Sequence, residues 1–150
     1  MKKEIVKNIF SDQSDTNIAL TSENNSPLLY KDLKVLANRI SRQLSGNNIS
    51  NKDRAAIILP NGPHMASSFL AISSYMSAAP LNPNYKADEY EFYLNDLKPK
   101  IVLVEQNSSN DVVGIAKKLK IPVCEIKIKE NQPTGFFDLF NDESLSLIHI

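Results

Sequence analysis

The chain alternates between short apolar runs and longer segments in which apolar residues recur at helical spacing. The clearest stripe, at i, i+3, i+4, i+7 and i+11, predicts a helix from about Tyr30 to Ser45. Its members are Leu33, Leu36, Ala37, Ile40 and Leu44. Gly46 and Asn47 follow, and both residue types tolerate the left-handed backbone that ends a helix. The next apolar segment, "AAIILP" at 55–60, is unbroken, which is typical of a strand covered on both faces.

The same reasoning divides the rest of the chain into short elements. Extended segments are predicted at 18–21, 28–30, 78–81, 100–105 and 121–128, and further helices at about 63–76, 88–97 and 110–119. Strands that alternate with helices indicate βαβ units, because parallel neighbours need a crossover connection. The predicted fold class is therefore α/β, with a mainly parallel sheet.

The stretch "AAPLNPNYKADEYEFYLNDL", residues 78–97, combines prolines, carboxylates and tyrosines. Pro80 has no backbone donor and belongs at the end or edge of a sheet, and the chain leaves the sheet before Pro83. Three carboxylates fall in the first turns of the following helix, where the helix dipole favours them: Asp88, Glu89 and Glu91. Nothing in the pattern suggests the burial that a catalytic acid needs. We therefore predict a structural rather than a catalytic role for the stretch.

The tyrosines of that stretch fit the same interpretation. Four residues at helical spacing form a predicted core-facing stripe with two polar tips: Tyr90, Tyr93, Leu94 and Leu97. Such a stripe is what a helix packed on a sheet requires.

Composition and charge disfavour nucleic acid and membranes as partners of this chain. With 150 residues, 42% of them hydrophobic, the chain can form about one domain with a real core. The 17 basic residues balance the 17 acidic ones, so no net field favours nucleic acid or an anionic membrane. Residues 55–85 carry no Asp, Glu, Lys or Arg, but prolines and asparagines interrupt them at both ends, so no membrane span is predicted. A single cysteine, Cys124, cannot form an internal disulfide, which favours a cytoplasmic location.

Few residues are candidates for chemistry. His64, beside Pro63 at a predicted helix start, is a possible ligand or base, but no second His or Cys lies near it, which favours a surface or capping role. Cys124 lies in an apolar strand pattern and is predicted to be an inert buried thiol. The four glycines, Gly46, Gly62, Gly114 and Gly135, form no phosphate-binding motif. On the residues alone, no catalytic, cofactor-binding or metal-binding residue is predicted.

Three motifs in order carry a family resemblance. Leu29–Leu33 is similar to "TYxEL", Asp53–Asn61 to "GDRVAILLPN" and Pro80–Tyr85 to "PLxPxY". In these motifs the chain resembles the adenylate-forming (AMP-binding) superfamily of acyl-CoA synthetases, coumarate-CoA ligases, luciferases and peptide-synthetase adenylation domains. "PLNPNYKADEYEFYLNDLKPK" in particular is similar to the coumarate- and oxalate-CoA ligase branch. The sequence departs from the pattern at Leu29, where Thr is usual, at Lys52, where Gly is common, and in lacking a glycine before "PLxP".

The resemblance implies an enzyme that uses Mg-ATP to convert a carboxylic acid to an acyl-adenylate and then transfers the acyl group to CoA. It also implies that the phosphate loop and the catalytic groups lie downstream, the loop soon after "TGFFDLFND" at 134–142. Residues 1–144 are then the N-terminal part of the large domain, inactive alone and binding no ATP, Mg²⁺ or CoA. The alternative is a stand-alone, non-catalytic α/β module that binds a ligand or partner at its strand ends.

The last six residues carry a separate expectation. "LSLIHI", 145–150, is what CTG TCT CTT ATA CAC ATC encodes, which is the mosaic-end sequence of transposon-based sequencing adapters. We therefore expect an adapter-derived tail at 145–150. A terminal strand with alternating side chains is the alternative.

Overall fold

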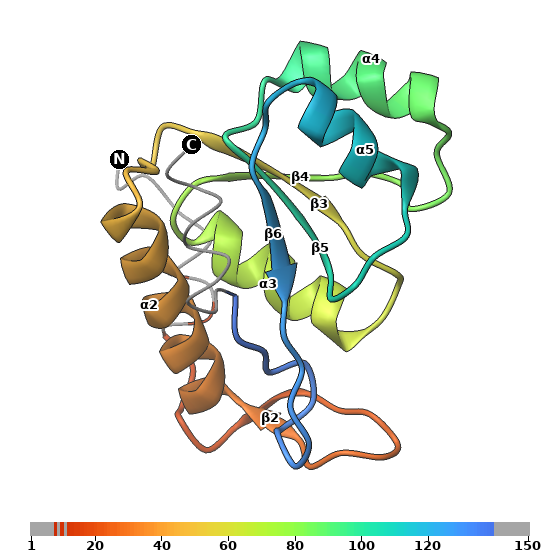
Figure 1. Ribbon diagram of the computed structural model, residues 1–150. Helices are drawn as coiled ribbons and strands as arrows, with labels where there is room; N and C mark the ends of the chain where they lie inside the picture. Colours follow the sequence, from red (N-terminus) through yellow and green to blue (C-terminus); the bar gives the residue numbers. More distant parts are fainter. Residues whose placement is uncertain (1–7, 9, 11, 140–150) are drawn as a thin grey trace.

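The computed structural model describes residue 8, residue 10 and residues 12–139 (Figure 1). The predicted domain end at 144 and the predicted tail at 145–150 lie outside these residues. Within them, the strands and helices alternate as the sequence predicts.

Four parallel strands form the central sheet. They are β3 (Arg54–Ile58), β4 (Ser77–Pro80), β5 (Ile101–Glu105) and β6 (Val123–Ile126), in the spatial order β4-β3-β5-β6. Each neighbouring pair is parallel, which confirms the predicted α/β class. Pro80 is the last residue of β4, an edge strand, so its missing donor interrupts no pairing inside the sheet.

Four helices connect or precede these strands: α2 (Tyr30–Gly46), α3 (Pro63–Ser73), α4 (Ala87–Leu97) and α5 (Asp111–Lys118). Their bounds lie close to the predicted ones, except that α3 ends before Met76. The hydroxyl groups of Ser73 and Ser74 donate to the carbonyls of Phe69 and Ala71, so these last-turn acceptors are satisfied by side chains. These side-chain bonds lie at the point where the helix ends.

A short antiparallel hairpin precedes α2. Its strands are β1 (Ile18–Leu20) and β2 (Leu28–Leu29). Leu29 is the N-cap of α2 and has no side-chain acceptor, but the Asp32 carboxylate accepts from the Leu29 N–H at 3.2 Å. The departure from Thr therefore costs the helix one of the two bonds of a capping box.

The core has two parts, one on each face of the sheet. In β3, Ala55 and Ile57 pack with α2 and α3, while Ala56 and Ile58 pack with α4 and α5. All four are buried, which confirms a strand covered on both faces. Figure 1 shows α4 and α5 side by side on one face, with α3 below the other. Among the described helices, none combines the length and apolarity that crossing a bilayer requires.

Candidate functional site

The carboxyl ends of β3 and β5 form the candidate site. These strands are neighbours, but β3 leads into α3 on one face and β5 leads into α5 on the other. The connecting loops, 59–62 and 106–110, therefore diverge at this point. In open parallel sheets a crevice at such a switch point is the usual place for a ligand.

The loop after β4, residues 81–86, is held beside this edge by two side chains from other elements. The Tyr90 hydroxyl, on α4, donates to the Asn82 carbonyl at 2.8 Å. Asn110 Nδ2 donates to the Pro83 carbonyl at 2.8 Å, while Asn110 Oδ1 accepts from the Val112 N–H at 2.9 Å and caps α5. Asn110 thus joins the loop after β4 to the helix after β5.

Three tyrosines cluster together, one from that loop and two from α4. Tyr85 stacks on Tyr93, with ring centroids 5.1 Å apart, and meets the buried Tyr90 ring edge-on at 5.8 Å. A hydrogen bond with the Tyr93 side chain raises the pKa of Tyr85, and burial raises the pKa of Tyr90. Both phenols stay protonated at neutral pH, so they act here as packing groups and donors. Of the predicted stripe, Tyr90 and Leu94 are buried, and Tyr93 and Leu97 are half-buried.

The carboxylates of α4 bind the start of the helix, pair with a lysine or face solvent. Glu89 Oε2 accepts from the Lys86 N–H at 2.8 Å, at the start of the helix. Glu91 pairs with Lys118 of α5 at 2.7 Å, and Asp88 is exposed. The geometry therefore gives these carboxylates the helix-terminal and surface roles that the sequence predicts.

Residues 133–139, which we call the strap, run back from β6 to α2 and α3. Thr134 fastens it to the segment before β2: its N–H and its hydroxyl both donate to the Ser26 carbonyl, at 2.9 and 3.0 Å. The Ser67 hydroxyl, on α3, donates to the Gly135 carbonyl at 2.6 Å. The strap therefore lies in a fixed position beside the start of α3.

The end of the strap is fixed by charge and by burial. Asp138 pairs with Arg39 at 2.8 Å and with Lys129 at 2.6 Å, and its backbone exchanges two hydrogen bonds with Lys127. The Arg39 guanidinium also lies 5.4 Å from the centre of the Phe136 ring. Phe137 and Leu139 are buried in the same core part as α2 and α3. The chain is thus anchored up to the last described residue.

His64 is half-buried in the first turn of α3, next to the strap. Burial lowers its pKa from 6.5, and a hydrogen bond with the Phe136 backbone opposes this shift in part. The N-cap of the helix is Gly62, so His64 is not the cap. The structure places it as a neutral side chain between α3 and the strap rather than at an open surface.

We expect His64 to lower the free energy of unfolding when the solution is acidified. Because its folded pKa is below the unfolded value of 6.5, the unfolded chain binds the proton more readily, and stability is lost as pH falls from 6.5 through the folded value. Above 6.5 the contribution is constant. Urea unfolding at neutral pH and at about pH 5 should show a larger loss in the parent chain than in His64→Gln. Equal losses would contradict the assignment.

Cys124 lies in β6 and is fully buried. Burial raises the pKa of its thiol to about 12. The thiolate is therefore scarce at neutral pH, as the prediction of an inert thiol requires.

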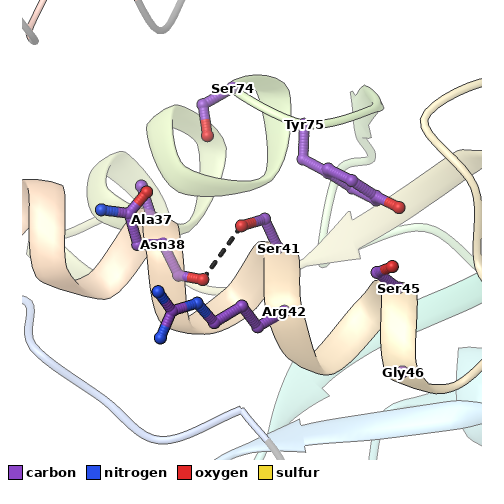
Figure 2. A pocket seen from close by; sticks show the side chains of 8 residues that line it. All are labelled: Ala37, Asn38, Ser41, Arg42, Ser45, Gly46, Ser74 and Tyr75. Carbon is purple, nitrogen blue, oxygen red and sulfur yellow. Dashed lines mark hydrogen bonds between the residues drawn. The ribbon is translucent and has the colours of Figure 1, made fainter.

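A shallow groove of about 550 Å³ lies between α2 and the turn after α3 (Figure 2). Its lining residues are Ala37, Asn38, Ser41, Arg42, Ser45, Gly46, Ser74 and Tyr75. Figure 2 shows that the Ser41 hydroxyl points back to the Asn38 carbonyl, a bond of 2.9 Å within α2. The groove borders the end of α2 and the turn before β4, where the strands begin. It is therefore remote from the carboxyl ends of the strands.

The described residues show no multi-ligand metal cluster and no phosphate-binding glycine motif. Across the part of the chain that the structure describes, no group of three or more His, Cys, Asp or Glu side chains could hold a metal ion. Gly46 and Gly114 lie at the end of α2 and inside α5, while Gly62 precedes α3 and Gly135 reaches the start of α3 from the strap. These glycines do not stand together in one loop, where successive backbone N–H groups could bind a triphosphate.

Sequence reasoning missed several residues that shape this region. Ser67, Thr134 and Gly135 hold the strap, and Asn110 joins two loops. The "PTG" run was a usable turn signal, and Asn before a helix is a usual N-cap. Their partners lie 27 to 108 residues away in sequence, so the contacts themselves were not readable.

Comparison with known proteins gives a consistent result. The family model described as "AMP-binding enzyme" matches residues 10–144. Oxalate–CoA ligase of Saccharomyces cerevisiae is 27% identical over 141 residues, which are 87% of this chain and 26% of that protein. Oxalate–CoA ligase of Arabidopsis thaliana is 39% identical over 82 residues, 54% of this chain and 16% of that protein.

A solved structure shares the fold. Apo MatB from Rhodopseudomonas palustris superposes with a TM-score of 0.69 at 22% identity, over 94% of this chain and 26% of that one. The chain thus spans about a quarter of the length of the yeast relative and of this structure.

Proposed function

The chain belongs to the AMP-binding enzyme family, and from this premise we propose that it is the N-terminal part of an ATP-dependent acyl-CoA synthetase. The reaction would join a carboxylate to AMP with release of pyrophosphate, and then replace AMP by the thiol of CoA. The observation that carries the proposal is the family match over residues 10–144. The two oxalate–CoA ligases among the similar proteins support CoA as the acyl acceptor.

In this proposal the described residues build a scaffold. The sheet and the helices on its two faces form a three-layer core, and the strap carries the chain from β6 to the side of α3. Because the glycines form no phosphate-binding motif, we assign ATP, Mg²⁺, CoA and the carboxylate to the remainder of a longer enzyme. We likewise propose residues 1–144 as the enzyme segment and 145–150 as adapter-derived, with a cytoplasmic location and no nucleic-acid partner.

The 150-residue chain is expected to catalyse no carboxylate-dependent exchange of labelled pyrophosphate into ATP. The reason is that the groups for phosphate and carboxylate chemistry lie in later segments under the proposal. The assay should include oxalate, an aromatic acid and a fatty acid, with a full-length acyl-CoA synthetase as the positive control. Exchange above the no-carboxylate background would show that this chain itself contains the catalytic groups.

The coding sequence itself separates the proposal from its alternative. Reading the source locus past the codon for Ser144 should reveal further enzyme sequence with a Ser/Thr/Gly-rich loop that contains a lysine. A stop codon directly after Ile150, in codons unlike those of the adapter, would favour the stand-alone module that binds a ligand at its strand ends.

A further inference from the structure

The loop between β3 and α3 contains a chemically labile pair, Asn61 and Gly62. Asn61 is the only asparagine in the sequence that is followed by glycine. Glycine carries no Cβ, so nothing on the following residue hinders approach of its backbone nitrogen to the asparagine side chain. The pair lies in the loop at the carboxyl end of β3, at the switch point.

The structure leaves both reacting groups accessible. Asn61 and Gly62 are exposed, and a Cβ built on Gly62 would meet no atom within 4 Å. Among the hydrogen bonds between described residues, none involves the Asn61 amide and none is donated by the Gly62 N–H. The nucleophile and the electrophile are therefore not held apart by hydrogen bonds within the described structure.

The position of the pair also favours the charge that develops. Gly62 is the N-cap of α3, a helix of 11 residues, so the positive end of the helix dipole lies directly beside it. A positive potential stabilises the deprotonated backbone nitrogen that attacks and the oxyanion that forms on the amide carbon. The wider backbone freedom of glycine, here at φ +156, lets the loop adjust toward the cyclic product.

We propose that Asn61 is a site of spontaneous deamidation in the folded protein. The Gly62 nitrogen attacks Asn61 Cγ, loses its proton, and forms a five-membered succinimide as the side-chain nitrogen leaves as ammonia. Water then opens the ring at either carbonyl to give an isoaspartyl or an aspartyl residue, with no change of oxidation state. Either product places a new carboxylate at the start of α3, and the isoaspartyl form adds one backbone carbon between β3 and α3.

Peptide mapping of the intact 150-residue chain tests the proposal. After incubation at mildly alkaline pH, the peptide containing Asn61 should gain one mass unit and become a methyl acceptor for an isoaspartyl methyltransferase. Incubation at mildly acidic pH should slow the conversion, because the attacking nitrogen must lose its proton. Asn61→Gln is the matched control, since a glutamine would have to close a less favourable six-membered ring. In that variant both signals should disappear from this peptide.

Cys124 reports whether the converted molecules are folded. Its buried thiol should resist a thiol reagent in the native chain and react when the chain unfolds. The proposal requires conversion at Asn61 in molecules whose Cys124 stays unreactive. It is overturned if the amide persists over a period in which a free peptide spanning residues 58–66 is largely converted, or if conversion is confined to molecules with a reactive Cys124.

Discussion

Gly135→Ala is expected to lower the free energy of unfolding by roughly 2 to 4 kcal/mol. Gly135 has φ +74, a conformation that costs a residue with a Cβ about 1 kcal/mol or more. The added Cβ would lie 2.9 Å from the Pro63 carbonyl oxygen, a backbone atom that cannot move without shifting the start of α3. It would also lie 3.2 Å from Ser67 Oγ, the donor that holds the strap. Steric repulsion and the loss of this anchor act together.

Gly114→Ala is the matched control for this substitution. Gly114 lies inside α5, where a Cβ would meet nothing within 4 Å. Alanine there should raise stability by about 0.5 to 1 kcal/mol, because it is the better helix former. Urea unfolding of both variants should therefore give changes of opposite sign. A loss at Gly135 no larger than about 0.5 kcal/mol would contradict the close approach of the strap to α3.

The fold was predictable because each element carries its own local signal. The unbroken run of β3 and the helical stripe of α2 depend on residues near one another in sequence, and the structure places both where the pattern predicts. The end of α3 was less predictable, because the apolar pattern runs on to Met76 while the helix ends at Ser73. Strand order was open as well, because alternation alone does not say on which side of β3 the strand β5 pairs.

The candidate site was predictable only in part. The carboxyl edge of the sheet follows from the α/β class, but its switch point requires the strand order. His64 was visible as a candidate, yet its half-buried place beside the strap depends on Phe136, 72 residues further along the chain. The family motifs were a stronger indication than any one side chain, because they depend on order and spacing rather than on tertiary contacts.

Tyr90→Ala should cost about 3 to 5 kcal/mol of unfolding free energy. Tyr90 is fully buried against the sheet with Leu94 and with residues of α5, so truncation leaves a cavity among side chains that cannot close over it. The substitution also removes the hydroxyl that donates to the Asn82 carbonyl. Phe92→Ala, two residues along the same helix and on its exposed face, should change stability by less than about 0.5 kcal/mol.

Tyr90→Phe separates the two contributions of Tyr90. It keeps the ring in the core and removes the hydroxyl that donates to the Asn82 carbonyl, which should cost about 1 kcal/mol. Because Asn110 still holds Pro83, the loop at 81–86 should loosen locally without unfolding the domain. Amide hydrogen exchange should therefore accelerate at Asn84 and Tyr85 but not in β3. If exchange in the loop were unchanged in Tyr90→Phe, Asn110 alone would position this loop beside the switch point.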